Sequence, residues 1–135
     1  MKPASNQLCE DLLLFLGRVK HELLVLAEER ELTVMQLFAL FAINREGQLA
    51  MGRVAEVLHC DASNVTGIVD RLVHRQLVLR NESAYDRRTK TLQLTDKGKA
   101  ILDELMSVVP TRLGCDKLSA TEQSIFQTVT QKISV

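Results

Sequence analysis

The 135-residue sequence is poor in the residues that interrupt helices: it has six glycines and two prolines, together with four phenylalanines, one tyrosine and no tryptophan. This is the composition of an ordinary globular protein with a bias towards helix. The three cysteines, Cys9, Cys60 and Cys115, are far apart and odd in number. They give no disulfide framework and no zinc-binding pattern, so we expect reduced thiols and no metal site.

Long apolar runs are also absent. No run approaches the roughly 20 residues that a membrane span needs, and the first residues, MKPASNQLCED, lack the apolar segment of a signal peptide. We therefore expect a cytoplasmic protein with no membrane partner, folded as a single domain over residues 1–135. The sequence has no nucleophile–base pair, metal cluster or phosphate-binding loop, so we expect neither an enzyme nor a cofactor.

Charge of one sign is not in excess over the whole chain, because 17 basic residues balance 17 acidic ones. The distribution is uneven. Residues 70–99 hold four acids, Asp70, Glu82, Asp86 and Asp96, against eight bases: Arg71, Arg75, Arg80, Arg87, Arg88, Lys90, Lys97 and Lys99. Such a local excess is what contact with phosphate requires, although a solvated surface alone would also produce it.

Apolar spacing and capping residues predict six helices. The first runs from Leu8 to Glu31, and its wide apolar surface indicates two buried faces, the second against a partner subunit. Thr33 caps a helix that stops at Gly47, and a third helix covers Met51–Leu58. After a turn at His59-Cys60-Asp61, Asp61 caps a fourth helix that reaches about Arg75. Thr95 caps a fifth helix ended by Pro110, a loop covers Pro110–Lys117, and Ser119 caps the last helix.

The fourth helix has an apolar stripe of Val65, Ile68, Val69 and Leu72 and a polar opposite face. That face presents Ser63, Thr66, Gly67, Asp70 and His74, with Asn64 and Arg71 on its flank. The candidate DNA-binding residues of this helix are Ser63, Asn64, Thr66, Gly67, Arg71, His74 and Arg75. Short side chains let a helix sink into the major groove, hydroxyls and amides meet base edges, and arginine reaches phosphate. An ordinary amphipathic surface helix remains the alternative at this point.

A hairpin follows this helix. Leu77–Asn81 reads as a strand and Lys90–Leu94 alternates with period two, while the polar segment between them ends in Asp86-Arg87-Arg88. Paired arginines suit a minor groove, where the narrow width concentrates negative potential. Asp86 could orient one of the arginines by a bidentate pair. We therefore add Asp86, Arg87, Arg88 and Lys90 to the candidate DNA-binding residues, and the fold predicted is a winged helix-turn-helix.

At these residues the sequence resembles the MarR family of winged-helix transcriptional regulators. The resemblance rests on Asp86-Arg87-Arg88 followed by Leu92-x-Leu94-Thr95-x-x-Gly98, on the segment from Val65 to Leu72, and on Leu32-Thr33-x-x-Gln36. It departs at Gly67, which has no side chain to read a base, and at Gln76, where the family commonly has glycine. His59 also stands where many helix-turn-helix units have glycine, so the turn should be strained.

The resemblance implies a mainly α fold with a small β-wing. Residues of about 33–98 would form the DNA-binding core, and about 6–31 and 99–135 the helices of a homodimer. It implies a repressor that binds a palindromic operator in double-stranded DNA, with Arg88 inserted into a minor groove and Asp86 holding it. It also implies release by a small aromatic or phenolic effector bound between the dimer helices and the winged domain.

Two other functions stay open. Cys9 is placed like the reactive cysteine of the family's peroxide-sensing OhrR branch, which would make the protein a thiol-based redox regulator. The tyrosines that assist that cysteine are missing, because leucines occupy the neighbouring positions and the one tyrosine is Tyr85. An apolar setting raises a thiol pKa, whereas a helix N-terminus lowers it. The remaining alternative is a winged-helix module that binds proteins and no longer binds DNA.

Overall fold

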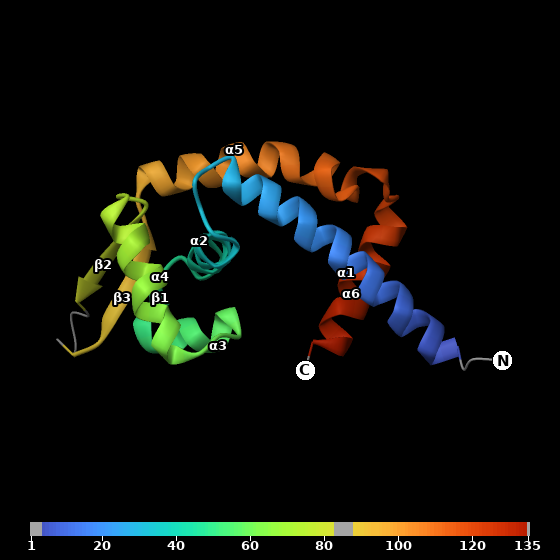
Figure 1. The fold of residues 1–135 in the computed structure, drawn as a ribbon, viewed down its shortest axis with the longest axis horizontal. Helices are drawn as coiled ribbons and strands as arrows, with labels where there is room; N and C mark the ends of the chain where they lie inside the picture. Colours follow the sequence, from blue (N-terminus) through green and yellow to red (C-terminus); the bar gives the residue numbers. More distant parts are fainter. Residues whose placement is uncertain (1–3, 83–87, 135) are drawn as a thin grey trace. The chain divides into compact units, whose positions relative to one another are not determined.

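The computed structural model describes residues 4–82 and 88–134 and has the predicted mainly α architecture with a small β-wing (Figure 1). In chain order its elements are α1 (Ala4–Glu28), α2 (Val34–Glu46), β1 (Leu49–Ala50), the 3₁₀ turn η1 (Met51–Arg53), α3 (Val54–Leu58), α4 (Ala62–His74), β2 (Val78–Glu82), β3 (Lys90–Leu94), α5 (Asp96–Leu113), the 3₁₀ turn η2 (Cys115–Lys117) and α6 (Ala120–Ile133). The chain divides into two compact units. We call residues 23–104 the central unit, and residues 1–22 with 105–135 the terminal unit.

The sheet of the central unit is antiparallel, with the strand order β1-β3-β2. Leu92 of β3 lies at its centre, paired with Leu49 on one side and with Arg80 on the other, and is fully buried. Because β1 belongs to the segment between α2 and α3, this pairing ties the wing to the helix-turn-helix. Leu49 and Ala50 are thus an edge strand of the wing sheet.

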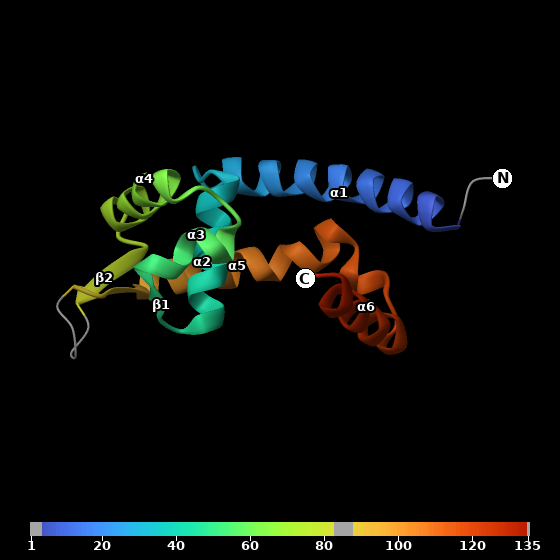
Figure 2. The same ribbon diagram turned by 90° about the horizontal axis from the view of Figure 1, so that it is seen from below.

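The core of the central unit is aliphatic. Helices α2, α3 and α4 pack against one another, α2 also contacts β3, and α4 also contacts β2 (Figure 2). The largest fully buried side chains of this unit are Leu26, Leu37, Leu40, Ile43, Leu49, Val54, Val69, Leu72, Leu77, Val78 and Leu92. Burial of a single such side chain stabilises the fold by roughly 1.5–3 kcal/mol. A common core therefore anchors α4 and, through Val78 and Leu92, the part of the wing next to it.

Three helices of the central unit end in the same hydrogen-bonded motif with a non-glycine residue at the left-handed position. Glu31 ends α1 (φ 55°), His59 ends α3 (φ 51°) and Gln76 ends α4 (φ 61°). In each case the amide of the following residue donates a hydrogen bond to the carbonyl five residues before it, as Leu32 N does to Ala27 O at 2.9 Å. This is the Schellman arrangement, in which glycine is usual. The strain predicted for His59 is confirmed.

Capping residues start and stop the other helices largely as predicted. Thr33 and Ser119 each form a capping box, in which the hydroxyl accepts from the amide three residues on and the side chain there accepts from the capping amide. Gly47, with φ 76°, follows the end of α2. Asp61 does precede α4, but its side chain makes no capping hydrogen bond.

Several predicted boundaries are wrong. Helix α1 runs from Ala4 to Glu28 and not from Leu8 to Glu31, because its last carbonyls accept from the amides of the turn through Glu31. The helix predicted from Met51 begins as the 3₁₀ turn η1, and α3 starts at Val54. Helix α5 continues through Pro110 to Leu113, so the loop predicted from Pro110 to Lys117 is instead the last turn of α5 and η2. A proline this close to a helix end removes one backbone hydrogen bond, and the chain turns only at Gly114, where φ is 79°.

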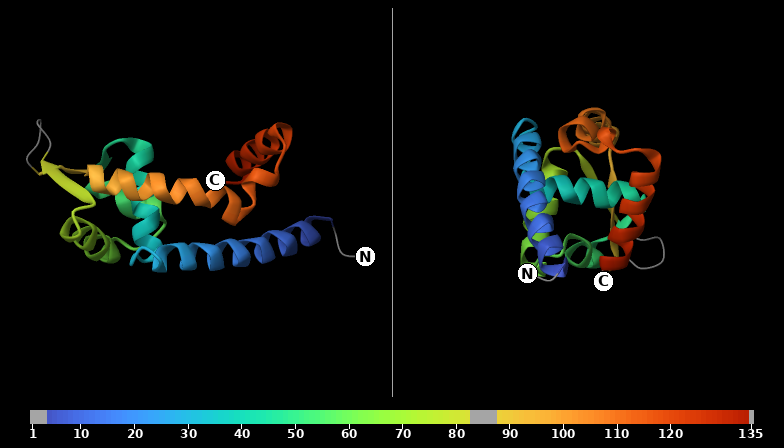
Figure 3. Two further views of the ribbon diagram at one scale, coloured as in Figure 1. Left: turned by 90° about the horizontal axis from the view of Figure 1, so that it is seen from above. Right: turned by 90° about the vertical axis from the view of Figure 1, so that its right-hand side faces the viewer.

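The terminal unit is held together by few internal contacts. The Arg112 guanidinium binds the Glu22 carboxylate at 2.9 Å, and Arg18 donates to the Leu113 carbonyl at 3.4 Å. The chain reverses between α5 and α6 through η2 (Figure 3). Among the described residues of this unit only Leu105 is buried. Many large apolar side chains are exposed: Leu8, Leu12, Leu13, Leu14, Phe15, Leu16, Met106, Val108, Leu118, Ile125, Phe126, Val129 and Ile133.

Within the described part of the chain, none of the helices has the length and apolar character to cross a membrane.

Candidate nucleic-acid interface

Helix α4 presents a continuous polar face. Its buried side consists of Val65, Val69 and Leu72, whereas Ile68 is only half-buried. The predicted contact residues on the opposite side are all exposed: Ser63, Asn64, Thr66, Gly67, Arg71 and His74. A Cβ added at Gly67 would meet nothing within 4 Å, so the centre of this face is open. The exposed face of the helix therefore has short side chains in its first half and basic side chains in its last turn. This arrangement suits a DNA groove lined by phosphates.

The turn that brings α3 to α4 is short. The amides of His59 and Cys60 donate to the carbonyls of Glu56 and Ala55, at 3.3 and 3.0 Å. His59 itself is exposed. Holding a non-glycine residue in the left-handed region costs roughly 1–2 kcal/mol. The packing of α3 against α4 offsets this cost and sets the angle at which α4 projects.

The start of α5 holds the junction between α4 and β2. Three successive carbonyls are bound: Arg75 O accepts from Lys97 Nζ (3.2 Å), Gln76 O from Thr95 Oγ1 (2.6 Å) and Leu77 O from Thr95 N (3.1 Å). Gly98 packs so closely on Leu77 that a Cβ on it would lie 2.2 Å from the Leu77 carbonyl oxygen. We call Thr95, Lys97 and Gly98 the α5 clasp.

Arg75 faces the protein and not the polar surface of α4. Its Nη1 donates to the Glu31 carbonyl at 2.7 Å and its Nη2 donates to the Arg30 carbonyl at 3.1 Å. Arg30 in turn reaches Glu104 of α5 at 3.3 Å. Because these bonds engage both terminal nitrogens of Arg75, its guanidinium ties the end of α4 to the turn after α1. Contact between Arg75 and DNA, expected from the sequence, would require these bonds to be given up or shared.

The wing consists of β2 and β3, and it connects to α4 through an ion pair that the sequence did not reveal. Arg80 of β2 donates from Nη2 to Oδ1 of Asp70 in α4 at 2.5 Å. Arg88 and Lys90 are exposed near the start of β3. The predicted residues Asp86 and Arg87 lie outside the described residues. Side chains alternate along a strand, so Arg80 lies on the same side of β2 as Val78. This alternation is the sequence signal that could have indicated the Asp70–Arg80 ion pair.

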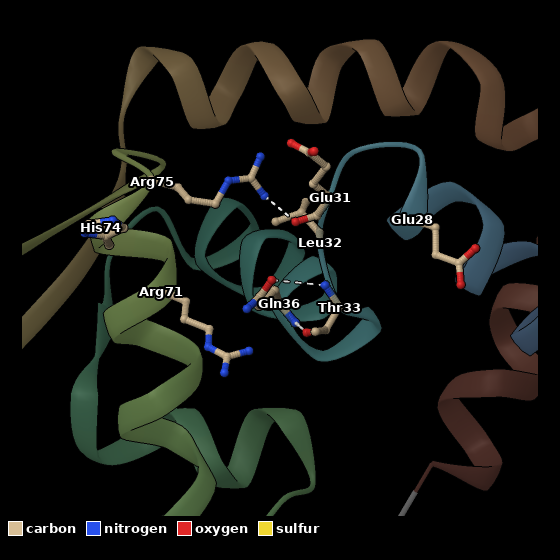
Figure 4. A pocket seen from close by; sticks show the side chains of 8 residues that line it. All are labelled: Glu28, Glu31, Leu32, Thr33, Gln36, Arg71, His74 and Arg75. Atoms are coloured by element: carbon tan, nitrogen blue, oxygen red, sulfur yellow. Dashed lines mark hydrogen bonds between the residues drawn. The ribbon is translucent and has the colours of Figure 1, made fainter.

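A pocket lies beside the polar face of α4, between that helix and the start of α2 (Figure 4). Its volume is about 500 Å³, within the range of small-molecule sites. The residues around it are Glu28, Glu31, Leu32, Thr33, Gln36, Arg71, His74 and Arg75. A second hollow of about 280 Å³ adjoins it and shares Thr33, Gln36 and Arg71. Gln36 is 95% buried, with its Oε1 occupied by the Thr33 amide at 3.0 Å.

The three cysteines are free thiols that differ in solvent exposure. Cys9 and Cys115 are exposed and Cys60 is half-buried. Cys9 lies in the second turn of α1, where the effect of the helix N-terminus on a thiolate has largely faded. Across residues 4–82 and 88–134, no cluster of histidine, cysteine and carboxylate side chains could hold a metal ion.

The sequence model of the MarR family matches residues 32–90. The transcriptional repressor MdtR of Bacillus subtilis is 32% identical over 108 residues, which cover 77% of this chain and 70% of MdtR. Two further Bacillus subtilis regulators, YhbI and YfiV, are matched over 52% and 44% of their lengths, so the chain spans about half of these relatives.

Solved structures agree in fold. Wild-type MarR from Escherichia coli in its apo form aligns with a TM-score of 0.76 and 21% identity, over 98% of this chain and 97% of that one. A cysteine-to-serine variant of MarR in complex with operator DNA gives 0.68 and 22%, over 98% and 99%. BpsR of Bordetella bronchiseptica, whose DNA binding is regulated by 6-hydroxynicotinic acid, gives 0.69 and 21%, over 93% and 99%.

Proposed function

The chain belongs to the MarR family, and from this premise we propose that it is a dimeric, sequence-specific DNA-binding repressor of transcription that a small ligand releases from its operator. The single observation that carries the proposal is the polar face of α4. Six predicted contact residues are exposed together there, while the other side of the helix is anchored in the core. Such a helix can enter a major groove without loss of core packing.

The wing supplies the second contact with DNA. Arg88 and Lys90 are exposed at the start of β3, and Arg88 corresponds to the arginine that the family inserts into a minor groove. We propose that Arg88 does so here, with Arg87 on the flanking phosphates and Asp86 orienting the wing arginine. On α4, Arg71 and His74 would contact phosphate, and Ser63, Asn64 and Thr66 would contact base edges. Gly67 would allow close approach without reading a base.

Pairing of two chains through the terminal helices is supported by exposed apolar surface. Thirteen large apolar side chains of the terminal unit are exposed in the single chain, with Leu8, Leu13 and Leu14 each more than 60% exposed. Contiguous apolar surface of this kind marks an interface. We propose that residues of about 6–31 and 99–135 form the dimer, and that residues of about 33–98 bind DNA. Twofold symmetry then requires a palindromic operator.

The pocket beside α4 is our candidate effector site. It combines the apolar Leu32 with basic side chains on α4, Arg71 and His74, and its rim also carries the carboxylates of Glu28 and Glu31; its volume suits one aromatic ring system. An aromatic carboxylate or phenolate would pair with Arg71, which belongs to the proposed DNA-binding face. Ligand and phosphate would then compete for the same guanidinium, so binding of one would weaken binding of the other.

The experiment that tests the function is a salt series. A labelled duplex from the DNA upstream of the protein's own gene is titrated with wild-type protein and with Arg88→Ala at several salt concentrations. We expect affinity to fall with salt, Arg88→Ala to weaken binding about tenfold, and the slope of log affinity against log salt to fall by about 1.

The control for that series is Lys132→Ala, which removes one exposed positive charge from α6 and should leave both affinity and slope unchanged. Absence of binding by the wild-type protein at low salt would contradict the proposal. It would favour instead a winged-helix module that binds protein partners.

A further inference from the structure

Asp70 is an unusual residue for the face of α4 that we assign to DNA. It lies among Ser63, Thr66, Gly67 and His74 and is half exposed, at 54% for the side chain. A carboxylate in this position repels the phosphates of an approaching duplex. Removal of this charge should therefore improve binding by simple electrostatics, unless Asp70 has a second task.

The contact of Asp70 with Arg80 supplies that task. Arg80 follows Val78 by two residues on β2, so both side chains lie on the side of the strand that faces α4. The Arg80 Nη2 donates to Asp70 Oδ1 at 2.5 Å, a short charge-assisted bond between the recognition helix and the wing. It is made at the middle residue of β2, two residues beyond the buried Val78.

Stability is a poor explanation for this pair. The Arg80 side chain is 29% exposed, yet its Nε is buried with no hydrogen-bond partner. A buried N–H without a partner costs free energy, and an ion pair that is half solvated returns little. Apolar side chains at position 80 would fill the same space without that cost. What the pair provides is a directional bond between α4 and β2, which restrains the distance between the two elements.

We propose that Asp70 and Arg80 form a brace that sets the wing at a fixed position on α4, so that one protomer can occupy a major groove and the neighbouring minor groove at once. The two residues are positioning residues and do not read bases. The inference rests on the proposed DNA-binding function. Without the brace, α4 would still enter the major groove, but Arg88 would reach the minor groove only in a fraction of encounters.

The test is a double-mutant cycle on DNA affinity with the wild-type protein as reference. The variants are Asp70→Asn, Arg88→Ala and the two combined, measured on the same upstream duplex. We expect Arg88→Ala to weaken binding about tenfold in the wild-type background and less than about twofold in the Asp70→Asn background, because an arginine that is no longer positioned has little affinity to lose. Equal losses in both backgrounds would overturn the brace.

The matched control is Asp61→Asn, which removes the same charge from the start of α4 at a residue whose side chain makes no capping bond. Electrostatics alone predicts that both asparagine variants bind DNA more tightly and keep their dependence on Arg88. The brace predicts that only Asp61→Asn does so. A retained Arg88 dependence in both variants assigns Asp70 to electrostatics alone.

A second route keeps the proposal testable if Asp70→Asn disturbs α4. Arg80→Met preserves the apolar stem and should keep thermal stability near that of wild type while losing the dependence on Arg88. The reversed pair, Asp70→Arg with Arg80→Asp, should restore that dependence. A reversed pair that behaves like Asp70→Asn would contradict the brace. Absence of DNA binding by the wild-type protein would instead remove the proposed function, and the brace with it.

Discussion

Replacement of Gly98 by alanine should destabilise the protein more than any other change of a single methyl group that we consider. Gly98 is the third residue of α5 and part of the α5 clasp. The new Cβ would lie 2.2 Å from the carbonyl oxygen of Leu77 and 3.1 Å from its carbonyl carbon. Ordinary contact begins at 3.4 Å, so the two segments must separate by about 1 Å.

The structure leaves little room for that movement. The Leu77 side chain is fully buried, its amide is bonded to Leu72 O at 3.0 Å, and its carbonyl accepts from Thr95 N. Separation would weaken two hydrogen bonds of the clasp, each worth about 1 kcal/mol, and overpacking adds about 1–3 kcal/mol. The better helix propensity of alanine returns about 1 kcal/mol. The expected net loss is about 2–4 kcal/mol.

Urea unfolding at one fixed protein concentration measures this loss, since the stability of an oligomer depends on concentration. The matched control is Gly67→Ala, a change to the same residue type inside a helix. Nothing lies within 4 Å of its new Cβ, so that variant should gain about 0.5–1 kcal/mol. A Gly98→Ala protein within about 0.5 kcal/mol of wild type would refute a rigid clasp.

Four other predictions can be checked separately. Leu12→Asp, in the exposed apolar face of α1, should shift the protein to a monomer in sedimentation velocity, because symmetry places the new charge in the interface twice; unchanged sedimentation contradicts the proposed dimer. Gln76→Gly should raise the free energy of unfolding by about 0.5–1 kcal/mol, whereas alanine there should not. Arg71→Ala should abolish any weakening of DNA binding by 6-hydroxynicotinic acid or benzoate; a response equal to that of wild type would place the effector elsewhere. Cys9→Ser should respond to organic hydroperoxide as wild type does. A variant that keeps its DNA affinity under hydroperoxide while the wild type loses it would identify Cys9 as the sensor.

Most of the fold could be predicted because its signals are local. The strand Lys90–Leu94 alternates with period two, and the structure gives it the same bounds. Thr33 and Ser119 were recognised as caps because a capping box is written in four consecutive residues. The end of α5 has no such local signal in the sequence. Pro110 lacks an amide proton and was expected to end the helix, yet α5 continues past it to Leu113 and the chain turns only at Gly114.

The exposure of the candidate site residues could be predicted from the sequence, but the hydrogen bonds and ion pairs that join the site to other elements could not. Exposure of Ser63, Thr66 and His74 follows from helical period alone. The bonds of Arg75 to the carbonyls after α1, and of Arg80 to Asp70, join elements 10 to 45 residues apart. Strand alternation could have indicated the side on which Arg80 lies, but helical period gave no sign that Arg75 binds the carbonyls after α1. The basic residues of 70–99 therefore include arginines that bind within the protein.

The structure explains why the sequence motif has threonine at position 95 and glycine at position 98. From the sequence, Thr95 was predicted to cap the fifth helix, and both residues supported the family resemblance. In the structure the Thr95 hydroxyl accepts from the Gly98 amide at 3.0 Å and also donates to Gln76 O, so one side chain caps α5 and holds the α4–β2 junction. The glycine is needed where two backbones meet, as the 2.2 Å distance to Leu77 requires.

The uneven burial of the two units has a consequence for the life of the protein in a cell. The central unit has its own core, whereas the terminal unit buries only Leu105 among its described residues. An unassembled chain would thus keep an ordered middle with apolar helices open to proteases and chaperones at both ends. If two copies pair through these helices as proposed, a newly made chain would escape removal by meeting a second copy, and abundance would rise more steeply than the rate of synthesis.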